Sequence, residues 1–379
     1  MKHDVVIIGG GLAGLTTGIR LQQKGFSTVM VSSGQSALHF FSGSFDGVIP
    51  EIADEAVRMF GDFGVRLKKG GWRLTPAGTF RESPLSLEDT AIFPEAHAGK
   101  SALIVNFDGY HDFFTSFIAE GLEKNGSSTR VVSLKMKELE HLRTSPSEMR
   151  SVNIARVMDG VWMKAAQEIR TMRRKEENVI LPHVFGLRDG SVTDRIRELL
   201  PGVQFIGTLP PSVPGIRLQM TLRRAYESLG GVFLMGDSVD SAALYEGTVS
   251  SITTKNLGTE RLFADTFVLA SGSYFSKGLS SSPSGVSEPL LGLDTVFEPD
   301  RNAWYRKDFF DDQPYMGFGL KTTGDLRAVK DGNPLDNLYV AGSILGATRS
   351  DLGTAAGLCL ASAIRIADTI CTHKEGEGK

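Results

Sequence analysis

Three glycines near the start of the chain, Gly9, Gly11 and Gly14, have the G-x-G-x-x-G spacing of a turn that binds a diphosphate. Gly9 permits a tight turn, Gly11 lets phosphate oxygens approach the backbone, and Gly14 lets the next helix lie close to the preceding strand. The helix N-terminus that follows directs unpaired N–H groups and the positive end of its dipole at the same point. We therefore expect these glycines, with Leu12 and Ala13 between them, to contact the phosphates of a nucleotide-like cofactor.

A complete β-α-β unit is predicted to hold this turn. Residues 5–8 form an unbroken apolar run, which is typical of a strand buried on both faces of a parallel sheet. Residues 15–24 have the pattern of an amphipathic helix that ends at Gly25, and residues 27–31 form the second strand. Because the strand, the helix and the second strand are all present, the glycine spacing is far more specific than it would be alone.

The end of the second predicted strand lacks the acidic residue that dinucleotide sites place there to bind ribose hydroxyls. Ser32 and Ser33 occupy these positions, and Gly34 follows them. A serine hydroxyl can also bond a ribose hydroxyl, although more weakly than a carboxylate does. We expect both serines to contact the cofactor, with its adenosine half loosely held or absent.

The next segment, residues 34–46, is rich in glycine, serine and aromatic residues. Ser42, Gly43 and Ser44 can offer hydroxyl and N–H groups to a phosphate or to a cofactor ring. His39 can act as an acid or a base beside that ring. A surface turn with a packed histidine explains the same residues equally well, so both interpretations stay open.

Two later apolar runs, residues 266–273 and 337–343, have the pattern of buried strands that end in small-residue turns. The residues of these turns that we expect to contact the cofactor are Ser271, Gly272, Gly342 and Ser343.

A helix of mostly small residues is predicted at residues 353–368. Ala355, Ala356 and Gly357 near its start would let a planar ligand lie against the backbone N–H groups. The helix dipole at that end would stabilise negative charge on the ligand.

The composition excludes several classes of function. The chain has 379 residues and a net charge of −3, so it has no global basic surface for nucleic acid. Cys359 and Cys371 have no metal or iron–sulfur spacing, and we expect them to be small packing residues. No signal peptide precedes the first strand and no apolar run reaches membrane-span length, which predicts a cytosolic protein without a metal site.

The glycine turn and the two later strand ends together resemble the two-dinucleotide-binding flavoprotein architecture. This resemblance implies a Rossmann-like α/β flavin-binding domain of the fumarate-reductase-like type, with an inserted α+β domain that covers the substrate. The flavin-binding domain is assigned to residues 1–47, 215–275 and 335–379, and the inserted domain to residues 48–214 and 276–334.

Two positions depart from that architecture. The family usually has threonine where Ser271 stands, and it has an aspartate or glutamate, which holds the ribityl chain, where Ser343 stands. Together with Ser32 and Ser33, Ser343 means that both acidic anchors of a flavin dinucleotide are serine here, and this departure favours a flavin without adenosine.

Six further stretches run in the same order as in the B subunit of the anaerobic glycerol-3-phosphate dehydrogenase, which the chain resembles over nearly its whole length. These stretches are residues 34–40, 152–156, 208–219, 270–275, 288–294 and 313–314. The resemblance implies FMN as the cofactor, with FAD as the alternative. It also implies a complex with two partners, an FAD-containing protein (the A subunit) and an iron–sulfur protein (the C subunit) that passes electrons to quinone. The chain would then be cytoplasmic and reach the inner face of the cytoplasmic membrane through these partners.

The activity that this resemblance implies is oxidation of sn-glycerol 3-phosphate to dihydroxyacetone phosphate, with hydride transfer from C2 to the flavin. It needs a base for the hydroxyl proton and cations for the phosphate. His39 is the first candidate base, and His183, which ends an apolar stretch typical of a core histidine, is the second. Arg217, in the proline-rich extended loop at residues 208–219, and Arg156 are candidate phosphate ligands. A structural salt bridge explains either arginine equally well.

Two other interpretations stay open. The chain can be a non-catalytic subunit whose flavin relays electrons or only stabilises the fold, because the sequence has no convincing catalytic carboxylate or Cys-His pair. It can also be a different small-acid or amine oxidase of the same fold.

Overall fold

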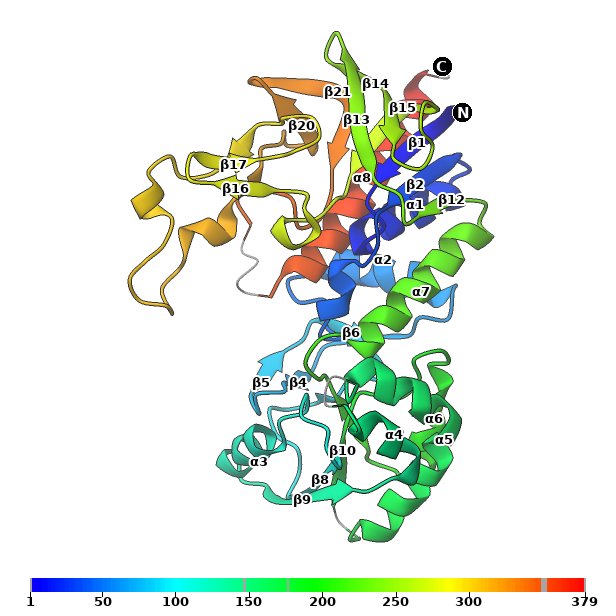
Figure 1. Cartoon of the computed structure of the whole chain (residues 1–379), viewed down its shortest axis with the longest axis vertical. Helices are drawn as coiled ribbons and strands as arrows, with labels where there is room; N and C mark the ends of the chain where they lie inside the picture. The colour runs from blue at the N-terminus through cyan, green and yellow to red at the C-terminus, as the bar shows by residue number, and fades with distance from the viewer. Residues whose placement is uncertain (1, 146–147, 176, 349–352, 378–379) are drawn as a thin grey trace. The chain divides into compact units, whose positions relative to one another are not determined.

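A computed structural model of the chain describes residues 2–145, 148–175, 177–348 and 353–377. The chain divides into two compact units, which are coloured by sequence position in Figure 1. Unit 1 comprises Met1–Ala37, Asp46–Met59 and Thr221–Lys379, and unit 2 comprises Leu38–Phe45 and Phe60–Met220. The polypeptide therefore starts and finishes in unit 1, as expected for a nucleotide-binding fold that carries an insertion.

Five parallel strands form the centre of unit 1. In order across the sheet they are β12 (Val232–Met235), β2 (Thr28–Ser32), β1 (Lys2–Ile8), β15 (Arg261–Leu269) and β21 (Asn333–Val340). Ile8 is level with Val31 on one side and with Leu269 on the other. The carboxyl ends of these strands therefore meet at one edge of the sheet, where open α/β folds bind their ligands.

Antiparallel strands extend the sheet beyond its parallel centre. β14 (Thr248–Thr254) pairs with β15 and with β13 (Val239–Tyr245), and β20 (Arg327–Lys330) pairs with β21. The sequence does not predict β13, because its residues are all exposed or half-buried and show no regular apolar alternation.

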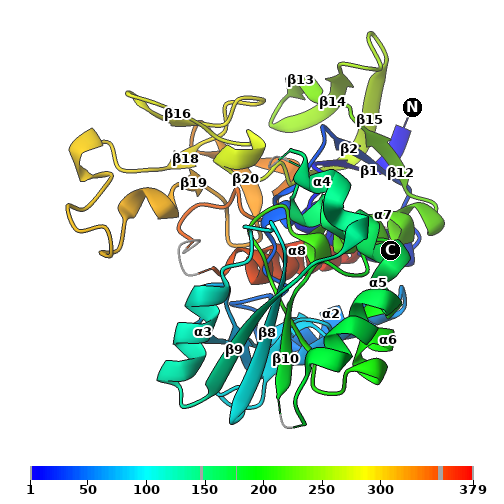
Figure 2. The same cartoon turned by 60° about the horizontal axis from the view of Figure 1, so that its bottom comes forward.

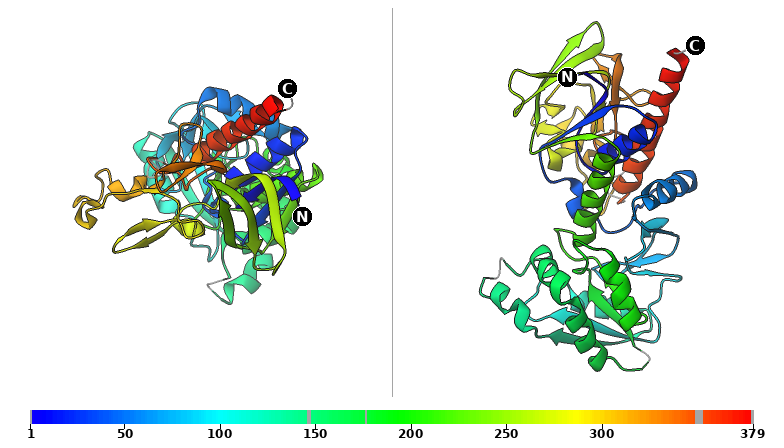
Figure 3. Two further views of the ribbon diagram at one scale, coloured as in Figure 1. Left: turned by 90° about the horizontal axis from the view of Figure 1, so that it is seen from above. Right: turned by 90° about the vertical axis from the view of Figure 1, so that its right-hand side faces the viewer.

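Two helices from opposite ends of the chain lie side by side in unit 1. α1 (Leu12–Gln23) packs on β1 and β2, and α8 (Ala355–Glu377) packs along α1, as the right-hand view of Figure 3 shows. Arg20 on α1 donates to both carboxylate oxygens of Asp368 on α8, at 2.6 and 3.0 Å. It also donates to Glu55 on α2 (Pro50–Gly61), so one guanidinium joins three helices.

α8 is also long and apolar enough to cross a membrane, by length and composition, over residues Ala355–Lys374. This finding differs from the sequence-based expectation that no such run exists. Within the protein 44% of the apolar window is buried, and Leu360 and Ile366 are fully enclosed. Because a core helix passes the same test, the finding is only weak support for a membrane span.

The connection between β15 and β21 also belongs to unit 1. It contains two short antiparallel pairs, β16 (Ser280–Ser282) with β17 (Gly285–Ser287) and β18 (Thr295–Val296) with β19 (Gly319–Leu320). The assignment of residues 276–334 to the inserted domain therefore differs from the structure. The physical reason is that side chains of this segment share a core with the parallel sheet; they include Leu291, Leu293, Trp304, Phe318 and Leu320.

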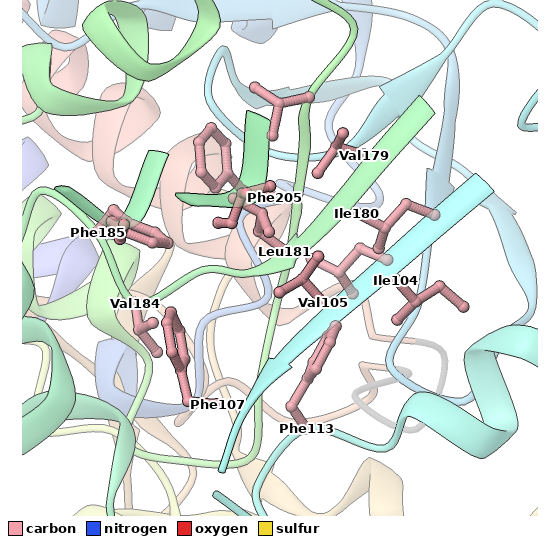
Figure 4. Packing of buried hydrophobic residues seen from close by; sticks show 14 of the residues in the cluster. Ile104, Val105, Phe107, Phe113, Val179, Ile180, Leu181, Val184, Phe185 and Phe205 are labelled. Carbon is pink, nitrogen blue, oxygen red and sulfur yellow. The ribbon is translucent and has the colours of Figure 1, made fainter. Parts of the chain in front are cut away.

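Unit 2 is built on a four-stranded parallel sheet. Its strands, in order, are β11 (Gln204–Ile206), β10 (Asn178–Pro182), β8 (Ser101–Phe107) and β9 (Ser128–Leu134). Figure 2 shows helix α3 (Thr115–Lys124) on one side of the sheet and helices α5 (Ser151–Met172) and α6 (Ser191–Leu199) on the other. Apolar side chains of β8, β10 and β11 gather into the core shown in Figure 4.

Short elements complete unit 2. The antiparallel strands are β3 (Leu67–Lys69) with β6 (Leu85–Leu87), and β4 (Trp72–Leu74) between β5 (Phe80–Glu82) and β7 (Ile92–Phe93). The short helices are η1 (Ala37–Phe40), which starts at the unit boundary, η2 (Lys137–Leu139) and α4 (Glu140–Arg143). Unit 2 therefore contains a parallel main sheet and two small antiparallel sheets. This is a more specific description than the α+β class predicted for the inserted domain.

The helix that crosses from unit 2 to unit 1 begins within the segment predicted to be an extended loop. α7 (Val213–Ser228) starts inside residues 208–219, for which the sequence predicts an extended loop. Pro214 is its second residue, and proline is tolerated in a first helical turn because the N–H group there has no intrahelical partner. The prediction of a proline-locked loop around Arg217 is therefore wrong, and Arg217 lies on a helix.

Replacing Phe205 with alanine should destabilise unit 2. The ring is fully enclosed, and its centroid lies 5.9 Å from that of Phe185 and 5.6 Å from that of His183. Loss of a buried phenylalanine ring costs about 3–5 kcal/mol. Urea unfolding followed by circular dichroism measures the effect. The matched control, Phe117→Ala, alters a ring that is 53% exposed and should change the free energy of unfolding by less than about 0.5 kcal/mol. Equal effects of the two substitutions would contradict this core.

Candidate functional site at the sheet edge of unit 1

The turn after β1 leaves no room for a side chain at two of its glycines. A Cβ atom on Gly9, whose φ is +119°, would lie 2.1 Å from the carbonyl oxygen of Ala270. A Cβ atom on Gly14 would lie 1.9 Å from the carbonyl oxygen of Gly9. The chain itself therefore requires these two glycines, because β1, α1 and the end of β15 approach one another backbone to backbone.

Gly11 differs from its neighbours because protein atoms leave space for a side chain there. A Cβ atom on Gly11 would meet only the Cβ atom of Ser36, at an ordinary contact distance of 3.5 Å. Its φ of −84° suits any residue, and no side chain caps the helix at this position. Since neither packing nor backbone conformation requires glycine, the space in front of the α1 N-terminus fits the phosphate group of a flavin.

The turns after β15 and β21 lie beside the glycine turn. A Cβ atom on Gly342, whose φ is +83°, would lie 2.9 Å from the Cβ atom of Ala13. A Cβ atom on Gly272 would lie 3.8 Å from Oγ of Ser343. The structure thus brings together three segments that are far apart in the sequence.

Ser271 supplies a second observation that fits a bound flavin. Its Oγ is buried and has no hydrogen-bond partner among the described residues. A buried hydroxyl without a partner is costly, and such groups are uncommon in folded proteins. A polar group of a flavin at this sheet edge would satisfy it.

Ser32 reaches the same turn from the end of β2. Its Oγ lies 2.6 Å from the position of a Cβ atom on Gly10, beside the ring of Phe233. Ser33, the next residue, is exposed. Any contact with a ribose here would therefore use a hydroxyl group in place of the usual carboxylate.

The small residues at the start of α8 have a structural explanation. A Cβ atom on Gly357 would lie 2.5 Å from both the Asp46 carbonyl oxygen and the Val48 nitrogen, and the Gly357 N–H donates to that carbonyl at 3.2 Å. Close approach of residues 46–48 thus accounts for Gly357 without a ligand. The roles of Ala355, Ala356 and Gly357 as flavin contacts stay predictions.

Cys359 lies beside the turn after β21 and the start of α1. Its Sγ is 3.3 Å from the position of a Cβ atom on Gly342. Burial raises the pKa of the Cys359 thiol to about 11, and the backbone N–H groups of Ser343 and Ala13 act in the opposite direction without outweighing burial. The thiol is therefore protonated at neutral pH and serves as a small packing group.

The predicted flavin contacts Ser42, Gly43 and Ser44 belong to unit 2. Ser44 shares a hydrogen bond of 2.6 Å with the hydroxyl of Ser83. A Cβ atom on Gly43, whose φ is +89°, would lie 2.2 Å from Oγ1 of Thr90. Contacts within unit 2 therefore hold this segment, and its role as a flavin ligand stays a prediction.

His39, the first candidate base, also belongs to unit 2. Its carbonyl oxygen accepts a hydrogen bond of 2.7 Å from the Ser212 N–H, whereas its half-buried ring makes no hydrogen bond to a described residue. Burial lowers the pKa of His39, so the neutral ring that can accept a proton predominates at pH 7.

His183, the second candidate base, is part of a buried charged cluster in unit 2. Its Nε2 lies 3.2 Å from Oδ2 of Asp89, which also accepts a hydrogen bond from Arg217. Burial lowers the pKa of His183, and Asp89 offsets this only in part. Burial raises the pKa of Asp89, but Arg217 and His183 outweigh it and hold that pKa well below its usual value. The cluster therefore contains a neutral imidazole, a carboxylate and a guanidinium.

The two candidate phosphate ligands differ in the hydrogen bonds that they already make within the protein. Arg217 donates to Asp89 and, at 2.7 Å, to the Gly186 carbonyl oxygen, which fits the structural salt bridge considered above. Arg156 is exposed on α5 and donates only to Asn153, at 2.8 Å, among the described residues. The sequence gives no sign of Asp89 as a partner, because it lies 94 positions from His183 in a loop.

Comparison with known proteins places these residues in a family. A family model described as an FAD binding domain matches residues 4–54 and 48–359. The B subunit of anaerobic glycerol-3-phosphate dehydrogenase from Yersinia enterocolitica is 35% identical over 421 aligned positions, covering 99% of each chain. The protein of the same name from Pectobacterium carotovorum is 35% identical, covering 99% of this chain and all of its own length.

Solved structures of an oxidase and a dehydrogenase also align with the chain. Glycine oxidase from Bacillus cereus is 13% identical with a TM-score of 0.38, covering 99% of this chain and 96% of its own. L-proline dehydrogenase from P. horikoshii is 12% identical with a TM-score of 0.37, covering 97% and 93%.

Gly11→Glu should abolish flavin binding and leave the fold intact. The new side chain would fill the space in front of the α1 N-terminus and place a negative charge where a phosphate is expected. The ratio of flavin absorbance to protein in the purified variant measures the loss. The control is Gly324→Glu, because no protein atom lies within 4 Å of a Cβ atom there. Normal flavin content in Gly11→Glu, or unfolding of its apo form, would contradict this site.

His183 should make the protein less stable in mild acid. Its pKa in the folded state is below the unfolded value of about 6.5, so the unfolded chain binds more protons below that pH. The stability that the folded protein gains from keeping His183 neutral is complete above pH about 6.5, and it is lost as the pH falls towards the pKa of His183 in the folded state. His183→Gln should flatten the dependence of the melting temperature between pH about 7 and 5. The exposed-residue control, His111→Gln, should keep the wild-type slope, and the same slope in all three proteins would contradict the buried cluster.

Proposed function

The chain belongs to the family of the B subunit of anaerobic glycerol-3-phosphate dehydrogenase, and from this premise we propose that it is a flavin-dependent dehydrogenase subunit that oxidises sn-glycerol 3-phosphate. The product would be dihydroxyacetone phosphate, because oxidation at C2 converts the alcohol to a ketone. The observation that carries the proposal is the space at Gly11, in front of the α1 N-terminus. The packing of the chain does not require a glycine there, so the space is open to a ligand.

The residues at the sheet edge favour FMN over FAD. Ser32 and Ser343 stand where dinucleotide-binding flavoproteins usually have acidic residues for the ribose and the ribityl chain. FMN ends at one phosphate, which the α1 N-terminus can bind, and it has no adenosine ribose for a carboxylate to hold. The match to an FAD-binding family keeps FAD as the alternative.

Bound flavin supplies the acceptor for the hydride that leaves C2 of the substrate. The residues of this chain must then accept the proton of the C2 hydroxyl and bind the phosphate group. His39 suits the first role, because its ring has no hydrogen-bond partner among the described residues and is neutral at pH 7. His183 suits it less well, since its side chain is 1% exposed and its Nε2 faces Asp89.

Arg156 is the better-supported phosphate ligand of the two arginines. Its exposed guanidinium keeps donors for a bidentate contact, whereas that of Arg217 is paired with a buried carboxylate. Removing Arg217 would leave the buried Asp89 carboxylate without its guanidinium partner, at a cost of about 3–5 kcal/mol in stability. Arg217→Ala therefore tests folding more than it tests substrate binding.

Partner proteins follow from the family membership. The relatives are named as subunits, which supports the proposal that this chain works in a complex. We assign its partners as two further subunits, one that contains FAD and one with iron–sulfur clusters that delivers electrons to quinone, with the membrane reached through them. The described residues contain no group of three or more potential metal-binding side chains, so the iron–sulfur carrier is assigned to a partner.

A second candidate function is an electron-relay or structural flavin subunit. The observation that favours it is the Asp89 cluster, in which one base candidate and one phosphate-ligand candidate both already contact the same buried carboxylate. In that case substrate oxidation would take place on a partner.

The cofactor released from the purified chain should be FMN. Heat or acid denaturation frees a non-covalent flavin, and chromatography against FMN and FAD standards identifies it. FAD in stoichiometric amount would mean that Ser32 replaces the usual acid without loss of adenosine binding.

His39→Ala and Arg156→Ala should change different kinetic constants of the assembled complex. The histidine variant should slow flavin reduction by about 100-fold or more with little change in substrate affinity. The arginine variant should weaken affinity about 10- to 100-fold, because one charged hydrogen bond contributes about 1.5–3 kcal/mol. Rapid-mixing measurements of flavin reduction against sn-glycerol 3-phosphate concentration separate the two effects.

Arg170→Ala, an exposed arginine on the same helix as Arg156, is the matched control. It should leave both constants unchanged. Wild-type kinetics in both test variants would assign substrate oxidation to a partner protein and favour the relay function.

A further inference from the structure

Exposed aromatic side chains of unit 1 concentrate between residues 274 and 315. They are Tyr274, Phe275, Tyr305, Phe309, Phe310 and Tyr315. The most exposed are Phe309 and Phe310, at 82% and 92%, on the segment from residue 305 to 313, which we term the aromatic loop. Its gold trace extends away from the sheet of unit 1 in Figure 1 and in the left-hand view of Figure 3. Two adjacent phenyl rings that lie almost wholly in water are unfavourable unless something covers them.

The aromatic loop is held in a defined conformation by its own polar groups. Gln313 accepts a hydrogen bond of 2.8 Å from the Arg306 N–H and donates one of 2.7 Å to the Asp308 carbonyl oxygen. The Asp308 carboxylate accepts the Phe310 N–H at 3.0 Å. Because these bonds fix the backbone before any partner arrives, the loop loses little conformational entropy on binding.

The base of the aromatic loop is anchored in the core of unit 1. Trp304 is buried, its ring centroid is 5.1 Å from that of Phe318, and its indole N–H donates to the Glu298 carbonyl oxygen at 2.6 Å. The Arg301 guanidinium lies 4.0 Å above the Trp304 ring. The aromatic loop therefore projects from a base that is packed into the core of unit 1.

A hollow of about 380 Å³ lies next to this base. Aromatic rings form most of its wall, including those of Tyr274, Tyr305 and Tyr315, which also bring hydroxyl groups. Tyrosine and tryptophan are enriched at the energetic centres of protein interfaces. The projecting phenyl rings and this hollow together have the form of a two-part docking surface, with one part that inserts and one part that receives.

The charges beside the phenyl rings favour a protein over a lipid surface. Asp308, Asp311 and Asp312 flank Phe309 and Phe310, and they outnumber the two cations of the same loop, Arg306 and Lys307. An anionic bilayer surface attracts basic segments and repels this acidic one. A protein surface with an apolar pocket and a basic rim would complement both features.

We propose that the aromatic loop docks into a partner protein of the same dehydrogenase complex, with Phe309 and Phe310 in an apolar pocket rimmed by basic side chains. This proposal rests on the proposed function, which supplies the partner: the relatives of this chain carry subunit names, so another protein is expected to cover part of its surface. The rings would bury apolar area at the centre of the interface, and the aspartates would speed association and fix orientation.

The test is co-expression of the full chain with the FAD-containing and iron–sulfur subunits, one of which carries an affinity tag. The double variant Phe309→Ser/Phe310→Ser should lower the affinity of the chain for its partner about 30-fold or more, with unchanged flavin content. Asp311→Lys should weaken association at low salt and lose this effect at high salt. The control Phe117→Ser, which alters a ring of unit 2 that is 53% exposed, should copurify like the wild type.

The outcomes separate the docking surface from the proposed function. If the wild type does not bind either partner, both the partner assignment and the docking proposal fail. If the wild type and the double variant bind equally, only the docking proposal fails. It also fails if the double substitution abolishes flotation with phosphatidylglycerol vesicles, or self-association in sedimentation, without altering assembly of the complex.

Discussion

The close approach of backbones at Gly9 and Gly14 is the constraint on which the rest of unit 1 depends. β1, the first turn of α1 and the end of β15 come so near one another that a single Cβ atom at either glycine would overlap a carbonyl oxygen. This contact aligns the ends of β1 and β15 at one sheet edge and directs the α1 N-terminus towards it. Gly11, which the chain does not need for packing, leaves the resulting space to a ligand.

Holding this edge requires distant parts of the chain to meet. The polypeptide leaves unit 1 after residue 37, returns for residues 46–59, and then builds unit 2 before it comes back at residue 221. The guanidinium of Arg20 joins α1 to Asp368 near the end of the chain and to Glu55 on α2. Since its side chain is only 15% exposed, this charge cluster is screened less by salt than a surface pair would be.

Local features of the structure could be predicted from the sequence, and features that depend on distant contacts could not. The first β-α-β unit was predictable because its strand, turn and helix signals are contiguous. The sequence does not reveal that Gly357 makes room for residues 46–48, or that Asp89 would pair with both His183 and Arg217. The prolines around Arg217 indicate a loop, but Pro214 occupies a first helical turn, which tolerates it.

A flavin bound along the edge formed by the turns after β1, β15 and β21 would cover backbone N–H groups of all three turns. Hydrogen–deuterium exchange of the chain, with and without its flavin, measures this directly at the backbone. Flavin should slow exchange in peptides covering residues 9–15, 271–273 and 342–344, while peptides from β8 and β10 in unit 2 should keep their rates. If flavin slowed exchange elsewhere and left the rates of all three turns unchanged, the result would contradict binding at this edge.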